Sequence, residues 1–275
     1  MKHAFIFFIS LFIIYGCAEK NGSGTNQPAS EESSIVTKEV TYTADGTMLK
    51  GFLAYDSSTT AKRPGIIVVH EWWGLTNYEK RRAMMLAKLG YVAFAIDMYG
   101  NGKIVDNPKD AGQSAAAAMH NMDTATAKFD AGLKILKEQP QTDTSKLAAI
   151  GYCFGGGVVL NMALHGADLD GVVSFHGDLP TSKVAHPKNV KAKVLVCTGE
   201  ADPFNPPKKV NAFEKAMNMA KVDYKVIKYP NAKHAFTNPA ADSLGKKFNL
   251  PIAYNQQADE KSWDAMQKFF DGLFK

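Results

Sequence analysis

Cysteine is scarce in this chain of 275 residues, which contains only three. Cys17 lies near the start, Cys153 is surrounded by glycines and Cys197 sits in an apolar run, so no disulfide framework is indicated. The lysines and arginines behind the net charge of +5 are scattered, and no segment combines basic with aromatic residues. Nucleic-acid binding is therefore disfavoured. The apolar run of residues 4–15 is too short for a comfortable membrane span.

The first residues have the composition of an export signal. A basic residue precedes the apolar run 4–15, and a small residue stands directly before Cys17. Residues 14–17, Ile-Tyr-Gly-Cys, resemble the lipobox of bacterial lipoproteins, which implies removal of residues 1–16 and lipidation of Cys17. The alternative is an ordinary secretory signal with an incidental cysteine. We expect an exported protein, anchored by lipid to a membrane of a bacterial envelope, in the periplasm or at the cell surface.

Residues 17–34 are polar, rich in glycine, serine and asparagine, and have no apolar periodicity. This composition predicts a disordered tether, followed by one folded domain over residues 35–275. The hydrophobic content of 45% is enough to bury a large core. Two alternating segments, residues 36–43 and 48–55, predict an antiparallel hairpin at the start of the domain.

Beyond the hairpin, short apolar runs alternate with amphipathic segments. This pattern predicts a mostly parallel, eight-stranded sheet with helices on both faces. The expected parallel strands are residues 65–69, 92–96, 147–150, 171–175, 194–198 and 224–229. The expected helices are residues 78–89, 110–138 as one helix or two, 154–164, 208–220 and 260–274.

Cys153 lies between an apolar strand and a helix that opens with glycines, in the sequence Gly-Tyr-Cys-Phe-Gly-Gly of residues 151–156. A nucleophile at the apex of a sharp strand-to-helix turn crowds its neighbours two residues away, and glycine relieves that crowding. Such a turn exposes the sulfur and directs the N–H of Phe154 at a developing oxyanion. The start of the helix also favours a thiolate. Alternatively, Cys153 is a small buried apolar residue and the glycines only allow close packing.

The carboxyl ends of parallel strands gather the chemistry of such sheets, so the residues after each expected strand are candidates. Glu71, Asp202 and His234 occupy such positions. With Cys153 they give the order nucleophile, acid, histidine, which is that of α/β-hydrolases. A hairpin followed by a parallel sheet, with the turn after the third parallel strand, is also the order of that fold. Asp202 could instead initiate a turn before Pro203, and His234 could be a solvated loop residue.

Three neighbouring residues leave alternatives open. Glu200 is a rival for the acid, and His176 follows a strand, where it either lines a pocket or is structural. His70 precedes Glu71 without the second histidine of the zinc motif H-E-x-x-H. We therefore expect neither a metal nor an organic cofactor.

Several motifs together resemble the dienelactone hydrolase family of the α/β-hydrolase superfamily. They are, in order, His-Glu-Trp-Trp-Gly at 70–74, Asp-Met-Tyr at 97–99, Gly-Tyr-Cys-Phe-Gly-Gly at 151–156, Ala-Asp-Pro at 201–203 and His-Ala-Phe at 234–236. The resemblance extends from about residue 36 to the C-terminus. It implies a hydrolase of esters, lactones or thioesters in which Cys153 is the nucleophile, His234 the base and Asp202 the residue that orients the base.

The resemblance also implies that Glu71 holds the resting thiol and releases it when substrate binds. The N–H of Trp72 would join that of Phe154 in the oxyanion hole. Competition between Glu71 and His234 for Cys153 would then act as a substrate-gated switch. The short polar connection after residue 176 leaves no room for a large cap domain. The side chains expected to line an aromatic pocket for a small ester or lactone are Trp73, Tyr99, His176 and Phe236.

A fold by itself does not establish activity. One alternative is a membrane-tethered binding lipoprotein that keeps a hydrolase fold without turnover. The presence of Cys153, Asp202, His234 and Glu71 together argues against it. Another is different chemistry on the same fold, such as a serine-type peptidase, which the cysteine at position 153 disfavours.

Overall fold

The computed structural model describes residues 34–275, which form one compact unit. The predicted export signal, the lipidated Cys17 and the tether up to residue 33 lie outside the described residues and stay predictions. None of the helices in the described part combines the length and apolarity needed to cross a bilayer.

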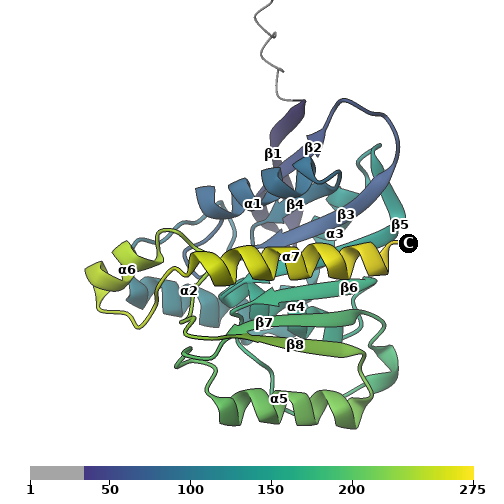
Figure 1. The fold of residues 1–275 in the computed structure, drawn as a ribbon. Coiled ribbons are helices and arrows are strands. Elements are labelled where there is room, and N and C mark those ends of the chain that lie inside the picture. Colours follow the sequence, from purple (N-terminus) through teal and green to yellow (C-terminus); the bar gives the residue numbers. More distant parts are fainter. Residues whose placement is uncertain (1–33) are drawn as a thin grey trace, which may run out of the picture. The chain divides into compact units, whose positions relative to one another are not determined.

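Eight strands of the described residues form one sheet in the order β1-β2-β4-β3-β5-β6-β7-β8 (Figure 1). Strand β2 pairs antiparallel with both β1 and β4. All the other neighbouring strands, from β4 and β3 to β7 and β8, pair parallel. The strands are β1 (Ile35–Ala44), β2 (Thr47–Asp56), β3 (Arg63–Val69), β4 (Val92–Ile96), β5 (Thr142–Tyr152), β6 (Gly171–Phe175), β7 (Lys193–Gly199) and β8 (Tyr224–Tyr229). All residues of β4 and β6 are buried, because helices cover both faces of the sheet.

Helices pack on the two faces of this sheet. The α-helices of the described chain are α1 (Asn77–Lys88), α2 (Pro108–His120), α3 (Met122–Lys137), α4 (Phe154–Leu164), α5 (Pro207–Ala220), α6 (Ala241–Phe248) and α7 (Gln256–Leu273). Helices α1 and α7 share one apolar core with the sheet, while α3, α4 and α5 share the other. In Figure 1, α7 crosses in front of the sheet, and α3 and α4 lie behind it.

The expected long helical segment at residues 110–138 is two helices, separated at Asn121. Asn121 has an extended backbone, ends α2 and caps α3 by accepting a hydrogen bond from the N–H of Thr124. The residues of α2 therefore turn away from the line of α3. Ala115 of α2 reaches the pocket described below.

The α/β-hydrolase architecture predicted from the sequence is confirmed. The segment after β6 contains only a short 3-10 turn, Pro187–Asn189, before β7, so no large cap domain is inserted there. Helix α6 was not expected. It follows β8 in a segment that also contains the His-Ala-Phe motif, and its position shapes the site.

Candidate active site

The backbone at Cys153 has the strained geometry expected of a nucleophile at a sharp turn. Its φ of 51° and ψ of −115° lie in a region that residues with side chains rarely adopt. Gly151 and Gly155 make the turn possible. A Cβ on Gly151 would overlap the carbonyl group of Gly155, and a Cβ on Gly155 would overlap the carbonyl group of Val69. The turn at Cys153 is thus as crowded as the sequence predicts. Cys153 is the only residue between the end of β5 and the start of α4.

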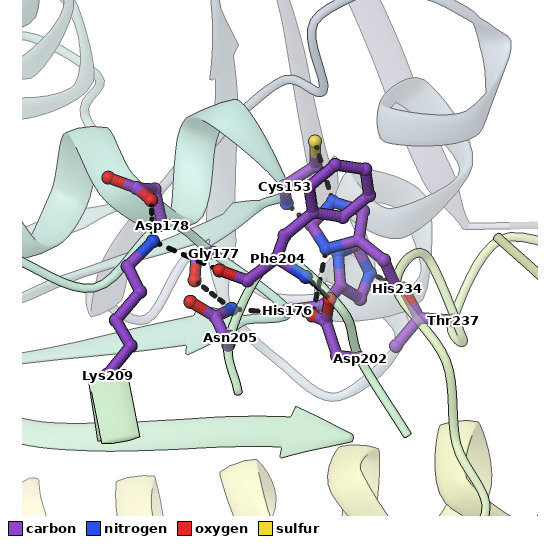
Figure 2. A network of polar contacts seen from close by, with 10 residues as sticks. All are labelled: Cys153, His176, Gly177, Asp178, Asp202, Phe204, Asn205, Lys209, His234 and Thr237. Atoms are coloured by element: carbon purple, nitrogen blue, oxygen red, sulfur yellow. Dashed lines mark hydrogen bonds and ion pairs between the residues drawn. The ribbon is translucent and has the colours of Figure 1, made fainter. Parts of the chain in front are cut away.

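Two acceptors hold the strained residue in place. The N–H of Cys153 donates to the carbonyl oxygen of Phe175 at 3.0 Å and to Nδ1 of His176 at 3.1 Å. His176 is fully buried, and burial lowers its pKa well below the ordinary value, so the ring is neutral. Its Nδ1 accepts, which leaves the proton on Nε2, 2.6 Å from Oγ1 of Thr237. His176 therefore ties the nucleophile turn to the segment that follows His234 (Figure 2).

The three residues of the predicted triad lie in one line of hydrogen bonds (Figure 2). Nε2 of His234 is 3.1 Å from Sγ of Cys153, and its Nδ1 is 2.9 Å from Oδ2 of Asp202. A carboxylate only accepts, so Nδ1 carries a proton and Nε2 is free to take one from the thiol. Asp202 also accepts from the N–H of Phe204 at 2.8 Å and from Nδ2 of Asn205 at 3.3 Å, which fixes its orientation.

The surroundings of His234 favour a charged imidazole. Burial alone lowers the pKa of His234, but Cys153 and Asp202 outweigh it and raise the pKa to about 10. The side chain of Asp202 has no exposed surface, so its charge acts on the ring with little screening by water. This arrangement stabilises the state in which His234 has accepted a proton.

Two backbone amides are available for an oxyanion beside the sulfur. Within residues 34–275, neither the N–H of Trp72 nor that of Phe154 donates to another protein group. The segment that carries Trp72 is fixed on both sides. Tyr99 donates from its hydroxyl to the carbonyl oxygen of Trp72 at 2.8 Å, and His70 accepts from the N–H of Met98 at 3.2 Å. Preorganised, unpaired amides of this kind suit an oxyanion.

Glu71 lies in the site but is not bonded to the thiol. Its Oε2 accepts from Nδ2 of Asn238 at 2.7 Å, while its buried Oε1 has no partner among the described residues. Burial, together with the nearby carboxylate of Glu79, raises the pKa of Glu71 from 4.5 to about 8. At neutral pH the side chain is therefore mostly a neutral carboxylic acid.

The raised pKa of Glu71 predicts a pH-dependent effect of Glu71→Gln on stability. Between pH 4.5 and 8 the folded protein holds a proton that the unfolded chain has released, so the free energy of unfolding falls as pH rises through this window. Glutamine cannot ionise and escapes this loss. We expect urea unfolding to show that the free energy of unfolding of the variant, relative to that of the wild type, rises by on the order of 3 kcal/mol between pH 5 and 9. A difference that stays constant with pH would mean that Glu71 titrates normally.

A pocket of about 290 Å³ opens beside Cys153 and His234. Its wall is mainly apolar, and α6 and the segment that follows it supply Leu244, Leu250 and Ile252. Trp72, Trp73 and Phe204 also line the pocket. This concave, largely apolar site next to the thiol of Cys153 is suited to a small organic molecule.

Only one of the four side chains predicted to line the pocket does so. Trp73 is part of the wall, whereas His176 and Phe236 are fully buried and do not reach the cavity. The prediction was wrong for these two because both turn toward the core, where their rings pack against each other at 5.2 Å. Tyr99 also lies outside the pocket lining and packs against the ring of Phe154.

Three residues that sequence reasoning missed complete the site: Asn205, Thr237 and Asn238. Asn205 holds Asp202, Thr237 joins His176, and Asn238 holds Glu71. Thr237 and Asn238 follow the His-Ala-Phe motif directly, but no periodicity marks them. A weak signal existed for α6, since two apolar residues stand four apart, two lysines lie in its last turn and Asn249 follows it. Among the described residues, no group of three or more His, Cys, Asp or Glu side chains could hold a metal ion.

Comparison with known proteins agrees with this fold. Residues 49–274 match the model of the dienelactone hydrolase family. "Protein usf" of Aquifex pyrophilus is 34% identical over 223 residues, covering 78% of this chain and 94% of the relative. A putative carboxymethylenebutenolidase of Aquifex aeolicus is 27% identical over 241 residues, covering 86% and 98%. A solved structure, described as a dienelactone hydrolase-like promiscuous phosphotriesterase from metagenomic libraries, has a TM-score of 0.82 and 34% identity, covering 87% of this chain and 99% of that one.

Proposed function

Because this chain belongs to the dienelactone hydrolase family, a family of hydrolases, we propose that it cleaves a carboxylic ester or lactone, or a thioester, by acyl transfer to Cys153. The observation that carries the proposal is the line of hydrogen bonds from Asp202 through His234 to the sulfur, beside two unpaired amides. This combination supplies a nucleophile, a base and a site for negative charge.

In the proposed reaction, Nε2 of His234 accepts the thiol proton and the sulfur of Cys153 attacks the carbonyl carbon. The N–H groups of Trp72 and Phe154 donate to the oxyanion. His234 then returns its proton to the leaving alcohol, and a thioester forms between the acyl group and Cys153. A water molecule that gives its proton to His234 hydrolyses this thioester and restores the thiol.

The test is the mass of the intact protein during hydrolysis of p-nitrophenyl acetate. A burst of p-nitrophenol, with a transient mass increase of one acetyl group, supports a thioacyl intermediate. Slow release without a burst or adduct would count against it. The alternative of a binding protein without turnover finds no support in the comparisons, and it predicts this negative outcome.

The proposed switch at Glu71 is tested separately. In the arrangement described above, the thiol is bonded to His234 and Glu71 to Asn238. We propose that in a second, resting arrangement Glu71 leaves Asn238 and competes for the thiol. Glu71→Gln is then expected to change the rate at which iodoacetamide alkylates Cys153 by several-fold, together with ester turnover. If both rates stay at wild-type values, the switch is abandoned, while the role of Cys153 is untouched.

A further inference from the structure

The pocket beside Cys153 has no free positive charge. None of its lining residues is lysine or arginine, and its ionisable members besides Cys153 and His234 are Glu71 and Asp178. Glu71 is only 3% exposed and mostly protonated at neutral pH because burial raises its pKa. Apart from the hydrogen-bonded pair of Cys153 and His234, the buried part of the pocket therefore offers no charge to a ligand at neutral pH.

Two cations near the pocket are already paired. At the rim, Lys209 forms an ion pair with Asp178 and donates to the carbonyl oxygen of Phe204 at 3.2 Å (Figure 2). The buried Arg82 donates to Asp259 at 2.5 Å and to the carbonyl oxygen of Thr237 at 2.7 Å. Neither side chain is free to receive a carboxylate from a substrate.

One buried acceptor beside the pocket would oppose a bound anion. Asn205 is 2% exposed, and its Nδ2 donates to the carbonyl oxygen of Gly177 at 2.9 Å and to Asp202. Both neighbours are acceptors, so the orientation of the amide is fixed and its Oδ1, which has no partner among the described residues, is an acceptor. The buried Oε1 of Glu71, which has no partner among the described residues, carries the acid proton at neutral pH and is a neutral donor. A carboxylate brought here would lose its hydration and find no lysine or arginine to replace it.

From these contacts we propose that the pocket selects uncharged esters and discriminates against esters that carry a carboxylate on the part bound by the wall of α6. The inference rests on the proposed ester hydrolysis and specifies its substrate class. Leu244, Leu250 and Ile252 bury the hydrocarbon portion of the substrate, and they offer nothing that could replace the water around an ionised group.

A matched pair of substrates tests the proposal: mono-p-nitrophenyl adipate, which has a free carboxylate, and its methyl ester, which has none. Both release p-nitrophenol, and the rate without enzyme is subtracted. We expect kcat/KM to be at least about 100-fold higher for the methyl ester, because the anion is desolvated without a partner. Equal values would overturn the proposal and leave ester hydrolysis standing. If neither compound is hydrolysed, the proposed function is refuted, and the proposed selectivity is refuted with it.

Two variants test whether charge at the pocket sets this ratio. Leu244→Arg places a cation in the half-buried wall. It is expected to reduce the ratio of kcat/KM for the methyl ester to kcat/KM for the anionic ester at least tenfold. The matched neutral variant Leu244→Gln should leave this ratio unchanged. If Leu244→Arg fails to fold, Asp178→Asn serves instead, because Asp178 is an exposed rim residue whose loss frees Lys209. It should raise kcat/KM about two- to fivefold for the anionic ester alone. Ratios unchanged in both variants would overturn the proposal.

Discussion

Replacing Cys153 by alanine is expected to lower kcat for p-nitrophenyl acetate at least about 10³-fold and to abolish the acetyl adduct. Alanine removes the sulfur that lies 3.1 Å from Nε2 of His234 and leaves the base without a nucleophile. The fold should survive, because the strained backbone at this position is held by the N–H of residue 153 and by the glycines around it. Burst kinetics with intact-protein mass measure both effects, and circular dichroism checks the fold.

Cys197→Ala is the matched control, because it removes the other cysteine of the described chain. Cys197 is fully buried in β7, and burial raises its pKa to about 12, so its thiol stays protonated and out of reach of an ester. The burst and the adduct should both persist in this variant. An adduct that disappears in Cys197→Ala and persists in Cys153→Ala would contradict the assignment of the nucleophile.

The parallel strands were predictable because they are covered on both faces. A strand such as β4, whose five residues are all buried, must be apolar throughout, and a continuous run of this kind is visible in the sequence. The break between α2 and α3 was harder to predict, because the apolar spacing continues on both sides of Asn121. A single capping side chain decides it, and asparagine also occurs at many positions that end no helix.

The meeting of Cys153, Asp202 and His234 could be predicted because these residues occupy positions set by topology. Cys153, Asp202 and His234 each follow a parallel strand, and the ends of parallel strands meet at one edge of the sheet. The direction of a side chain after a strand is not set in this way. His176 and Phe236 also follow strands, yet they turn inward because the core offers each an aromatic neighbour. Sequence spacing gives the place of a residue but not the rotamer that packing selects.

The support around the triad could not be predicted, since it depends on the path of the chain after β8. Thr237, Asn238 and α6 reach the site because the segment after His234 turns back across the ends of the strands, where Ala235 has a φ of 58°. The same segment supplies both the pocket wall and the partner of Glu71. The shape of the pocket and the contacts of Glu71 therefore both depend on a single loop and one short helix.

Asp202→Asn is expected to lower kcat about 10³- to 10⁴-fold while leaving the fold intact. In the wild type, Oδ2 of Asp202 accepts from Nδ1 of His234, which leaves Nε2 free to take the thiol proton. Asparagine keeps Oδ1 for the N–H of Phe204, which donates at 2.8 Å, and thereby turns its amide nitrogen toward His234. That nitrogen donates to Nδ1 and moves the ring proton to Nε2, where it faces the sulfur of Cys153.

The tautomer argument makes a sharper prediction than a simple loss of rate. Asp202→Asn should lower the rate of thiol alkylation together with kcat, since both need His234 to accept the proton of Cys153, while KM changes little. Asp168→Asn is the matched control, because it makes the same chemical change at an exposed ion pair with Lys137, and it should leave both rates unaltered. If Asp202→Asn alkylates as fast as the wild type and only turnover falls, Asp202 acts after the thiol has been activated. Its role would then lie in stabilising the charged imidazole during acyl transfer.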